Sequence, residues 1–164
     1  MDLKDKNNLM LEAIATNWGL TRAGDVHNIV WEIYYDMTYK VTKYVSELNP
    51  EDRDELPYIR CYVTKGKMKT AHFDNLKMLA NKKPWRTKDE IRACDGTAWD
   101  IKLYAEDGLL LNSSGKTYYI YGEEVLENIV GALPSRSFDN PKNDKDNKEC
   151  YTLSYFEYTM RFRD

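Results

Sequence analysis

The alternation of apolar and polar side chains is clearest between Cys94 and Gly108. Successive side chains of an extended chain point to opposite sides, so every second residue shares a face. This alternation predicts a half-buried strand over residues 97–104, bracketed by the turn-forming pairs Asp95-Gly96 and Asp107-Gly108. The predicted core side of the strand consists of Thr97, Trp99, Ile101 and Leu103. The outer side, which we expect to be available to a partner, consists of Asp100, Lys102 and Tyr104.

The same two-residue period recurs along much of the chain, interrupted by polar and glycine-containing turns. It predicts a hairpin formed by residues 29–35 and 39–45, followed by a third strand over residues 58–63. Further strands are expected at residues 109–111, 118–121 and 150–163. The last of these places Phe156, Tyr158, Met160 and Phe162 on one side. We therefore expect the C-terminal strand to join the sheet.

Three segments have apolar residues at helical spacing instead. Residues 70–82 carry the stripe Phe73, Leu76, Leu79 and Ala80, which should pack on the sheet. Residues 123–133 begin with two glutamates, favoured in a first helical turn, and Pro134 ends the helix. Residues 3–16 are expected to form a short helix within an N-terminal helical or irregular segment, residues 1–26. The predicted fold class is α+β: an antiparallel sheet of about five or more strands with two principal helices packed against it.

The length and composition indicate one folded domain covering residues 1–164. Hydrophobic residues make up 42% of the chain and charged residues 31%, as in soluble globular proteins. Residues 135–149 are the one extended stretch of low hydrophobicity, and they predict a mobile polar loop. No apolar run reaches the roughly 18 residues of a membrane span. A cytoplasmic protein is therefore expected.

The cysteines and histidines predict neither a metal site nor a cofactor. Cys61, Cys94 and Cys150 are odd in number and far apart, which argues against a disulfide framework and against a paired-cysteine metal site. The chain has two histidines, His27 and His72, and no local spacing typical of zinc ligands. We therefore expect no metal and no cofactor.

Basic residues are concentrated in the middle of the chain. Between residues 65 and 88 the only acidic residue is Asp74. The basic side chains are Lys65, Lys67, Lys69, Lys77, Lys82, Lys83, Arg86 and Lys88. Lysine-rich surfaces with aromatic neighbours bind nucleic acids, and this segment supports that function as an alternative. The sequence pI near 5.5 argues against a dedicated nucleic-acid binder.

Motifs for catalysis fail when their structural context is considered. Gly115-Lys116-Thr117 resembles the end of a phosphate-binding loop, but the earlier glycine and the following helix are missing. No nucleophile elbow or sequence-adjacent cysteine and histidine occurs. A small hydrolase remains a further alternative, with a site assembled in space from His72 or from the pair Glu106 and Asp107.

The pattern Asp95-Gly96-Thr97-x-Trp99-x-Ile101-x-x-Tyr104-x-x-x-Gly108, followed by Ser114-Gly115 and a closing helix, resembles a small bacterial domain of unknown function. The resemblance covers residues 27–133. It implies a hairpin and a helix ending in tryptophan before the strand, here Trp85. Members usually have tyrosine followed by proline before the closing helix, whereas Tyr121 is followed by Gly122. No catalytic residues come with this resemblance.

In general character the chain is also similar to phage-encoded inhibitors of bacterial defence, anti-CRISPR proteins included. It is acidic, has 13 tyrosines and lacks an active-site motif. The leading hypothesis is a non-enzymatic module that binds a protein partner in a bacterial or phage-infected cell. Besides the outer residues of the strand, acidic runs are the candidate contacts: Glu51, Asp52, Asp54, Glu55, Glu123, Glu124 and Glu127. Such carboxylates could stand in for the phosphates of a nucleic acid.

Overall fold

A computed structural model describes most of the chain. The described residues are 8–17, 24–47, 58–80, 96–117, 120, 124–143 and 149–162. Within these ranges the chain forms one antiparallel sheet, three α-helices and a short 3-10 helix, η1 (Pro141–Asn143). None of these helices is long and apolar enough to cross a membrane.

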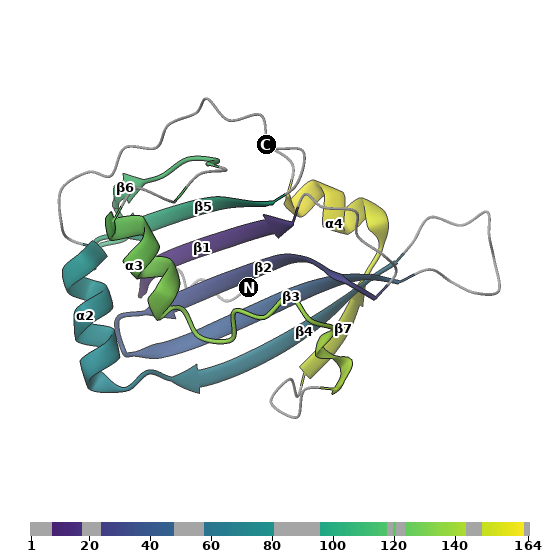
Figure 1. The fold of residues 1–164 in the computed structure, drawn as a ribbon, viewed down its shortest axis with the longest axis horizontal. Helices are drawn as coiled ribbons and strands as arrows, with labels where there is room; N and C mark the ends of the chain where they lie inside the picture. The colour runs from purple at the N-terminus through teal and green to yellow at the C-terminus, as the bar shows by residue number, and fades with distance from the viewer. Residues whose placement is uncertain are drawn as a thin grey trace.

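The described part of the sheet has seven strands, in the spatial order β6-β5-β1-β2-β3-β4-β7 (Figure 1). Their bounds are β1 (Leu9–Asn17), β2 (Val26–Tyr34), β3 (Thr38–Glu47), β4 (Tyr58–Lys67), β5 (Thr97–Tyr104), β6 (Leu110–Ser113) and β7 (Glu149–Leu153). Every neighbouring pair is antiparallel. The predicted α+β class is confirmed, but the sheet is larger than expected, and a helix near the C-terminus was not predicted.

Several strands lie where the alternation predicted them. The hairpin of β2 and β3, the following β4 and the β5–β6 pair all form. In β5 the core residues Trp99, Ile101 and Leu103 are buried, with Trp99 9% exposed. The turn after β5 uses Gly108 at a positive φ of 84°, a conformation that favours glycine. Of the strand predicted at residues 118–121, Tyr118, Tyr119 and Tyr121 lie outside the described residues.

The predicted N-terminal helix is wrong, because residues 9–17 form the strand β1. β1 lies between β5 and β2, so both of its edges are hydrogen-bonded to other strands, and one of these, β5, is distant in sequence. Leu11, Ala13 and Ala15 are fully buried on one face. This spacing of two residues is the side-chain period of a strand. Long-range pairing therefore outweighs the loose helical spacing that the segment shows locally.

Two helices cover one face of the sheet, as predicted: α2 (Thr70–Ala80) and α3 (Glu124–Ala132). They contact each other and lie at the same end of the sheet (Figure 1). Their inward residues Phe73, Leu76, Leu79, Leu126, Ile129 and Val130 are buried. Beneath them Trp31 of β2 stacks on Trp99, with ring centres 5.5 Å apart. The main hydrophobic core therefore lies between the helices and this face.

The chain after α3 makes specific contacts with the same face. Trp31 Nε1 donates a hydrogen bond to the carbonyl oxygen of Pro134 at 2.6 Å. Further along, Lys43 Nζ donates to the carbonyl oxygen of Ser137 at 2.7 Å, and Phe138 packs against the core. Residues 144–148 of the predicted polar loop lie outside the described residues.

The predicted C-terminal strand over residues 150–163 is too long. β7 ends at Leu153, and α4 (Tyr155–Arg161) follows. Ser154 caps this helix, since its Oγ accepts from the Glu157 backbone N–H and donates to Glu157 Oε1, both at 3.1 Å. Ser154 and Glu157 have the residue spacing of a capping box, here with the glutamate accepting from the serine hydroxyl instead of from its backbone N–H, and the helix starts at this point.

α4 packs on the face of the sheet opposite to α2 and α3. Tyr158 and Phe162 contact a second buried cluster, formed by Val30, Tyr44, Ile59 and Cys61. Phe162 meets the Tyr44 ring edge to face, with centres 5.0 Å apart and planes at 86°. The sheet is thus covered on one side by α2 and α3, and partly on the other by α4.

Candidate functional site

The face that carries α4 also has a row of charged residues crossing five strands. Cα partners along this row are Lys102 of β5, Glu12 of β1, Glu32 of β2, Lys40 of β3 and Lys65 of β4. Like charges directly opposite each other destabilise a sheet, and the row contains two such neighbouring pairs. Charged side chains are therefore closely spaced on this face, which is opposite to the face that carries the main hydrophobic core.

Glu12 shows the electrostatic effect of this spacing. Burial raises the pKa of its carboxyl, and the neighbouring carboxylates of Glu32 and Asp100 raise it further, while Lys102 lowers it. Glu32 is 3% exposed, and its Oε2 has no hydrogen-bond partner among the described residues. Negative charge is consequently disfavoured in the middle of this face.

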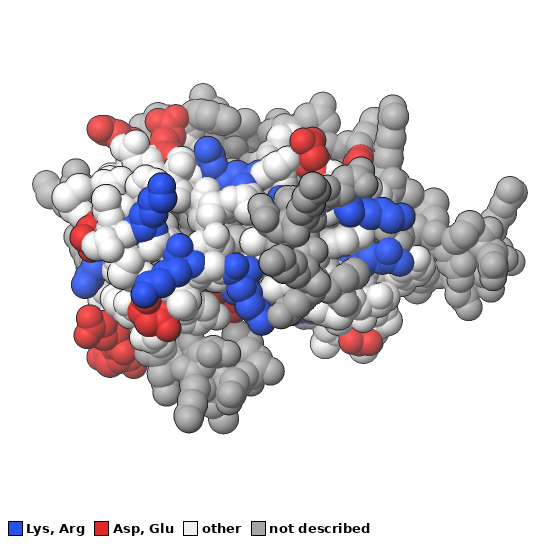
Figure 2. Space-filling view, turned by 90° about the horizontal axis from the view of Figure 1, so that it is seen from below, with Lys and Arg blue, Asp and Glu red and all other residues white. Residues whose placement is uncertain are grey.

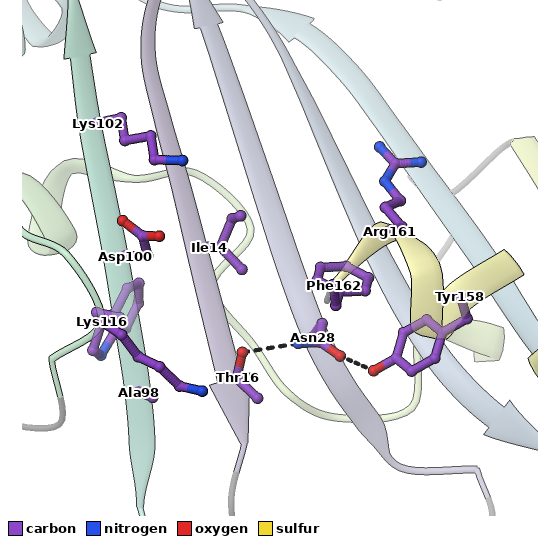
Figure 3. A pocket seen from close by; sticks show the side chains of 11 residues that line it. Ile14, Thr16, Asn28, Ala98, Asp100, Lys102, Lys116, Tyr158, Arg161 and Phe162 are labelled. Carbon is purple, nitrogen blue, oxygen red and sulfur yellow. Dashed lines mark hydrogen bonds between the residues drawn. The ribbon is translucent and has the colours of Figure 1, made fainter. Parts of the chain in front are cut away.

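A pocket of about 290 Å³ opens on this face between β5, β1 and α4 (Figure 3). Its lining is formed by Ile14, Thr16, Asn28, Ala98, Trp99, Asp100, Lys102, Lys116, Tyr158, Arg161 and Phe162. Lys102, Asp100 and Lys116 lie on one side of it, and the α4 side chains lie on the other (Figure 3). The pocket therefore joins parts of the chain that are far apart in sequence.

Three of the lining side chains are cationic and one is a carboxylate. Lys102 comes from β5, Lys116 from the segment after β6, and Arg161 from α4. The Arg161 guanidinium carbon lies 5.4 Å from the centre of the Tyr44 ring, within cation–π range. Asp100 supplies the carboxylate, and its Oδ1 is buried without a hydrogen-bond partner in the described part of the chain. The lining favours an anion with a hydrogen-bond donor.

A hydrogen-bonded relay forms the floor between β1 and α4. The Tyr158 hydroxyl donates to Asn28 Oδ1, and Asn28 Nδ2 donates to Thr16 Oγ1 at 2.9 Å (Figure 3). Burial raises the pKa of Tyr158 to about 12, so its hydroxyl keeps its proton at neutral pH. The relay fixes α4 on the sheet and so fixes one wall of the pocket.

The helix α4 and the adjoining strand β7 expose large apolar side chains. Tyr151 is 39% exposed, Tyr155 42%, Met160 51% and Phe156 71%. We call these four residues the C-terminal apolar surface. A helix that is apolar on both its inner and outer sides is typical of one buried by a further partner.

A second group of exposed apolar residues lies at the opposite edge of the sheet. Leu109, Leu110 and Leu111 are more than half exposed at and beside the edge strand β6. They are all leucine, a residue type under-represented among the residues that dominate binding energy at interfaces. The C-terminal apolar surface has the more typical interface composition.

The structure brings together one group of the predicted contact residues. Asp100 and Lys102 line the pocket, and Tyr104 follows them on the same side of β5. Glu124 and Glu127 are exposed on α3, at the other face of the sheet. The predicted contacts Glu51, Asp52, Asp54, Glu55 and Glu123 lie outside the described residues.

The sequence interpretation missed the contributions of Lys116 and α4. In the sequence Lys116 belongs to an incomplete phosphate-loop motif, and the alternation over residues 155–161 predicts a strand. Ser154 and Glu157 have the spacing of a capping box, and this signal could have revealed the helix. No local signal links Lys116 to Arg161, because 44 residues separate them and only the sheet brings them to one pocket.

The predicted nucleic-acid contacts are only partly described. Lys65, Lys67 and Lys69 are exposed at the end of β4 and before α2. Lys77 is exposed on α2, and its Nζ lies 5.8 Å from the centre of the Tyr35 ring. Figure 2 shows Lys and Arg towards the middle of the lower side of the molecule, with Asp and Glu mostly near its margins. Lys82, Lys83, Arg86 and Lys88 lie outside the described residues.

The candidates for hydrolysis occupy positions that favour other roles. His72 is exposed and lines a hollow of about 420 Å³ between α2 and α3, together with Asn75, Asn128, Gly131 and Ala132. This lining contains neither a nucleophile nor a carboxylate. Asp107 Oδ1 accepts from the Leu109 backbone N–H at 3.0 Å and so shapes the turn. Within the described ranges no group of three or more His, Cys, Asp and Glu residues could hold a metal ion.

The chain was also compared with known proteins. No family model matches it, and no match was found among curated proteins or solved structures. The contacts, burial and charges of the described residues are therefore what support a function.

Proposed function

We propose that this protein is a non-enzymatic binding module that contacts a protein partner through its C-terminal apolar surface. The observation that carries the proposal is the exposure of Tyr151, Tyr155, Phe156 and Met160 on two adjoining elements. Tyrosine, phenylalanine and methionine are enriched at the centres of protein interfaces. Their concentration on one short helix and strand gives the module a contact patch.

The gain from covering this surface is large enough to support binding. Fully burying a phenylalanine or methionine side chain contributes about 1.5 to 3 kcal/mol. Phe156 is 71% exposed and Met160 51% exposed, so much of that free energy is still available to a partner. These two residues are one helical turn apart and can enter the same hydrophobic groove.

α4 presents this surface in a fixed orientation. The capping box at Ser154 holds its first turn, and the bond from Tyr158 to Asn28 holds its inner side. Phe162 anchors the last turn against Tyr44. A preorganised surface loses less conformational entropy on binding, which favours affinity.

The class of partner follows from the general similarity to phage-encoded inhibitors. Such proteins act by occupying a surface of a bacterial defence complex, and the proposed contact patch suits that mode of action. The partner is expected to present an apolar groove, because Phe156 and Met160 are exposed on one helix.

The proposal is tested with matched substitutions on two faces. Phe156→Asp and Met160→Asp introduce a charge into the C-terminal apolar surface, whereas Met78→Asp does so on α2, where Met78 is 55% exposed. Tagged wild type and variants are used to capture partners from a bacterial lysate, and captured subunits are quantified against the bait. Far-ultraviolet circular dichroism checks that each variant is folded.

We expect a stoichiometric partner for wild type and for Met78→Asp, and at least about tenfold weaker binding for the two α4 variants. Capture that is equal for all four proteins would contradict the proposed surface. Absence of any stoichiometric partner, together with a monomer–dimer shift on light scattering that Phe156→Asp abolishes, would show that a second copy covers the surface instead.

A second candidate function is nucleic-acid binding, which the exposed Lys65, Lys67 and Lys69 favour. Binding through phosphate contacts weakens steeply as salt concentration rises. Fluorescence anisotropy with a labelled single strand should then show weaker binding for Lys65→Glu and Lys67→Glu than for wild type. Binding that is absent, or that is indifferent to salt, would exclude this function.

A further inference from the structure

We propose that the pocket between β1, β5 and α4 binds a small organic anion that also carries hydroxyl or amino groups. This site is distinct from the C-terminal apolar surface, because it faces the inner side of α4. It therefore extends beyond the proposed partner binding and does not require it.

The charge of the lining selects an anion. Lys102 and Lys116 line the hollow on one side and Arg161 on the other, with Asp100 as the lining carboxylate, although the chain as a whole carries a net charge of −3 (Figure 3). Cations held around a partly enclosed space repel one another and raise the local concentration of anions. A bound anion relieves that repulsion, so its binding is favoured.

Asp100 narrows the class of ligand. Asp100 lines the pocket, and its carboxylate would repel a simple anion. A ligand with a hydroxyl or amino group beside its charge can donate a hydrogen bond to this carboxylate, which turns the unfavourable contact into a favourable one. The site therefore discriminates between a hydroxylated anion and a bare one.

The remaining walls fit a molecule of modest size. Thr16 accepts from Asn28, so its own hydroxyl proton can be donated into the pocket. Ile14 and Ala98 supply apolar contact area. A volume of about 290 Å³ is at the small end for ligand sites, which favours a phosphorylated or carboxylated polyol over a nucleotide.

Three probes separate these features in isothermal titration calorimetry at constant ionic strength. Glycerol 3-phosphate has both the anion and hydroxyl donors, sulfate has the anion alone, and glycerol has the donors alone. We expect glycerol 3-phosphate to bind more tightly than sulfate, and glycerol not to bind. If glycerol 3-phosphate does not bind, or binds no better than sulfate, the proposal is overturned.

Lysine substitutions locate the binding. Lys102→Gln and Lys116→Gln should each weaken glycerol 3-phosphate binding by about tenfold, as expected for one lost charge-assisted contact. Lys142→Gln, at an exposed lysine of η1, is the matched control and should leave binding unchanged. Lys116 is exposed, so its substitution tests the site even if Lys102→Gln is poorly folded. Equal effects at all three lysines would show nonspecific charge attraction and refute the site.

Asp100→Ala tests the discrimination itself. Removing this carboxylate should strengthen sulfate binding and abolish the preference for glycerol 3-phosphate, a result that a purely structural role would not give. A preference that survives Asp100→Ala would contradict the assignment. Phe156→Asp should bind glycerol 3-phosphate normally, so failure of the partner surface and failure of this site remain distinguishable.

Discussion

Tyr158→Phe is the sharpest test of how α4 is held on the sheet. The substitution removes one hydroxyl and keeps the ring that contacts Tyr44 and Phe162. It takes away the donor to Asn28 Oδ1, while the bond from Asn28 to Thr16 can remain. Because Asn28 is 2% exposed, water does not readily replace the lost donor.

The expected loss follows from that geometry. Leaving a buried acceptor without a partner costs about 1 to 3 kcal/mol of unfolding free energy. For a protein of this length each kcal/mol corresponds to about 2 to 4 °C in the melting temperature. Tyr155→Phe is the matched control, because Tyr155 is largely exposed on the same helix, and its loss should stay below about 0.5 kcal/mol.

Urea unfolding followed by circular dichroism at pH 7 measures both variants. A change for Tyr158→Phe no larger than that for Tyr155→Phe would refute the proposed relay. Urea unfolding at alkaline pH provides a second test of the Tyr158 hydroxyl. The folded chain holds the Tyr158 proton to about pH 12, so wild-type stability should fall as the pH rises from about 10 towards 12. Tyr158→Phe should lack this part of the decline.

Two further predictions concern the two faces of the sheet. Trp31→Phe should lower the unfolding free energy by about 2 to 4 kcal/mol, because it weakens the stack with Trp99 and removes the donor to the Pro134 carbonyl; an unchanged urea midpoint would contradict this. Glu12→Gln should be more stable than wild type at pH 7, since burial raises the pKa of Glu12 and so disfavours its charged form. That advantage should disappear once the pH falls below the ordinary carboxyl pKa, and a constant advantage from pH 3 to pH 7 would argue against it.

The sequence predicted elements whose local pattern and tertiary role agree. In β5 the alternation around Trp99 places the apolar side chains in the core, and in α2 and α3 the helical stripes face the sheet. The outer residues Asp100 and Lys102 line the candidate pocket, and their contact with a partner stays a prediction. The predictions for β5, α2 and α3 are confirmed because the spacing of apolar residues along an element indicates which of its faces is buried.

Predictions failed where distant residues decide the local structure. β1 becomes a strand because β2 and β5 pair with both of its edges, and no pattern within residues 3–16 contains that information. At the C-terminus the alternation that predicted a strand was outweighed by the capping box at Ser154 and by contacts of Phe162 with Tyr44. Secondary structure in such segments follows from tertiary context.

By itself, then, the sequence determined an antiparallel sheet with two helices packed against it, and it predicted that the outer side of β5 is available for contact. Only the tertiary structure decided that Lys116 and Arg161 complete a pocket with Asp100 and Lys102, and that α4 exposes Phe156 and Met160. The physical reason is that the spacing of apolar side chains indicates which face of an element is buried. Which distant residues become neighbours depends on the order of the strands in the sheet, and the local spacing does not contain that order. Binding sites depend on the second property.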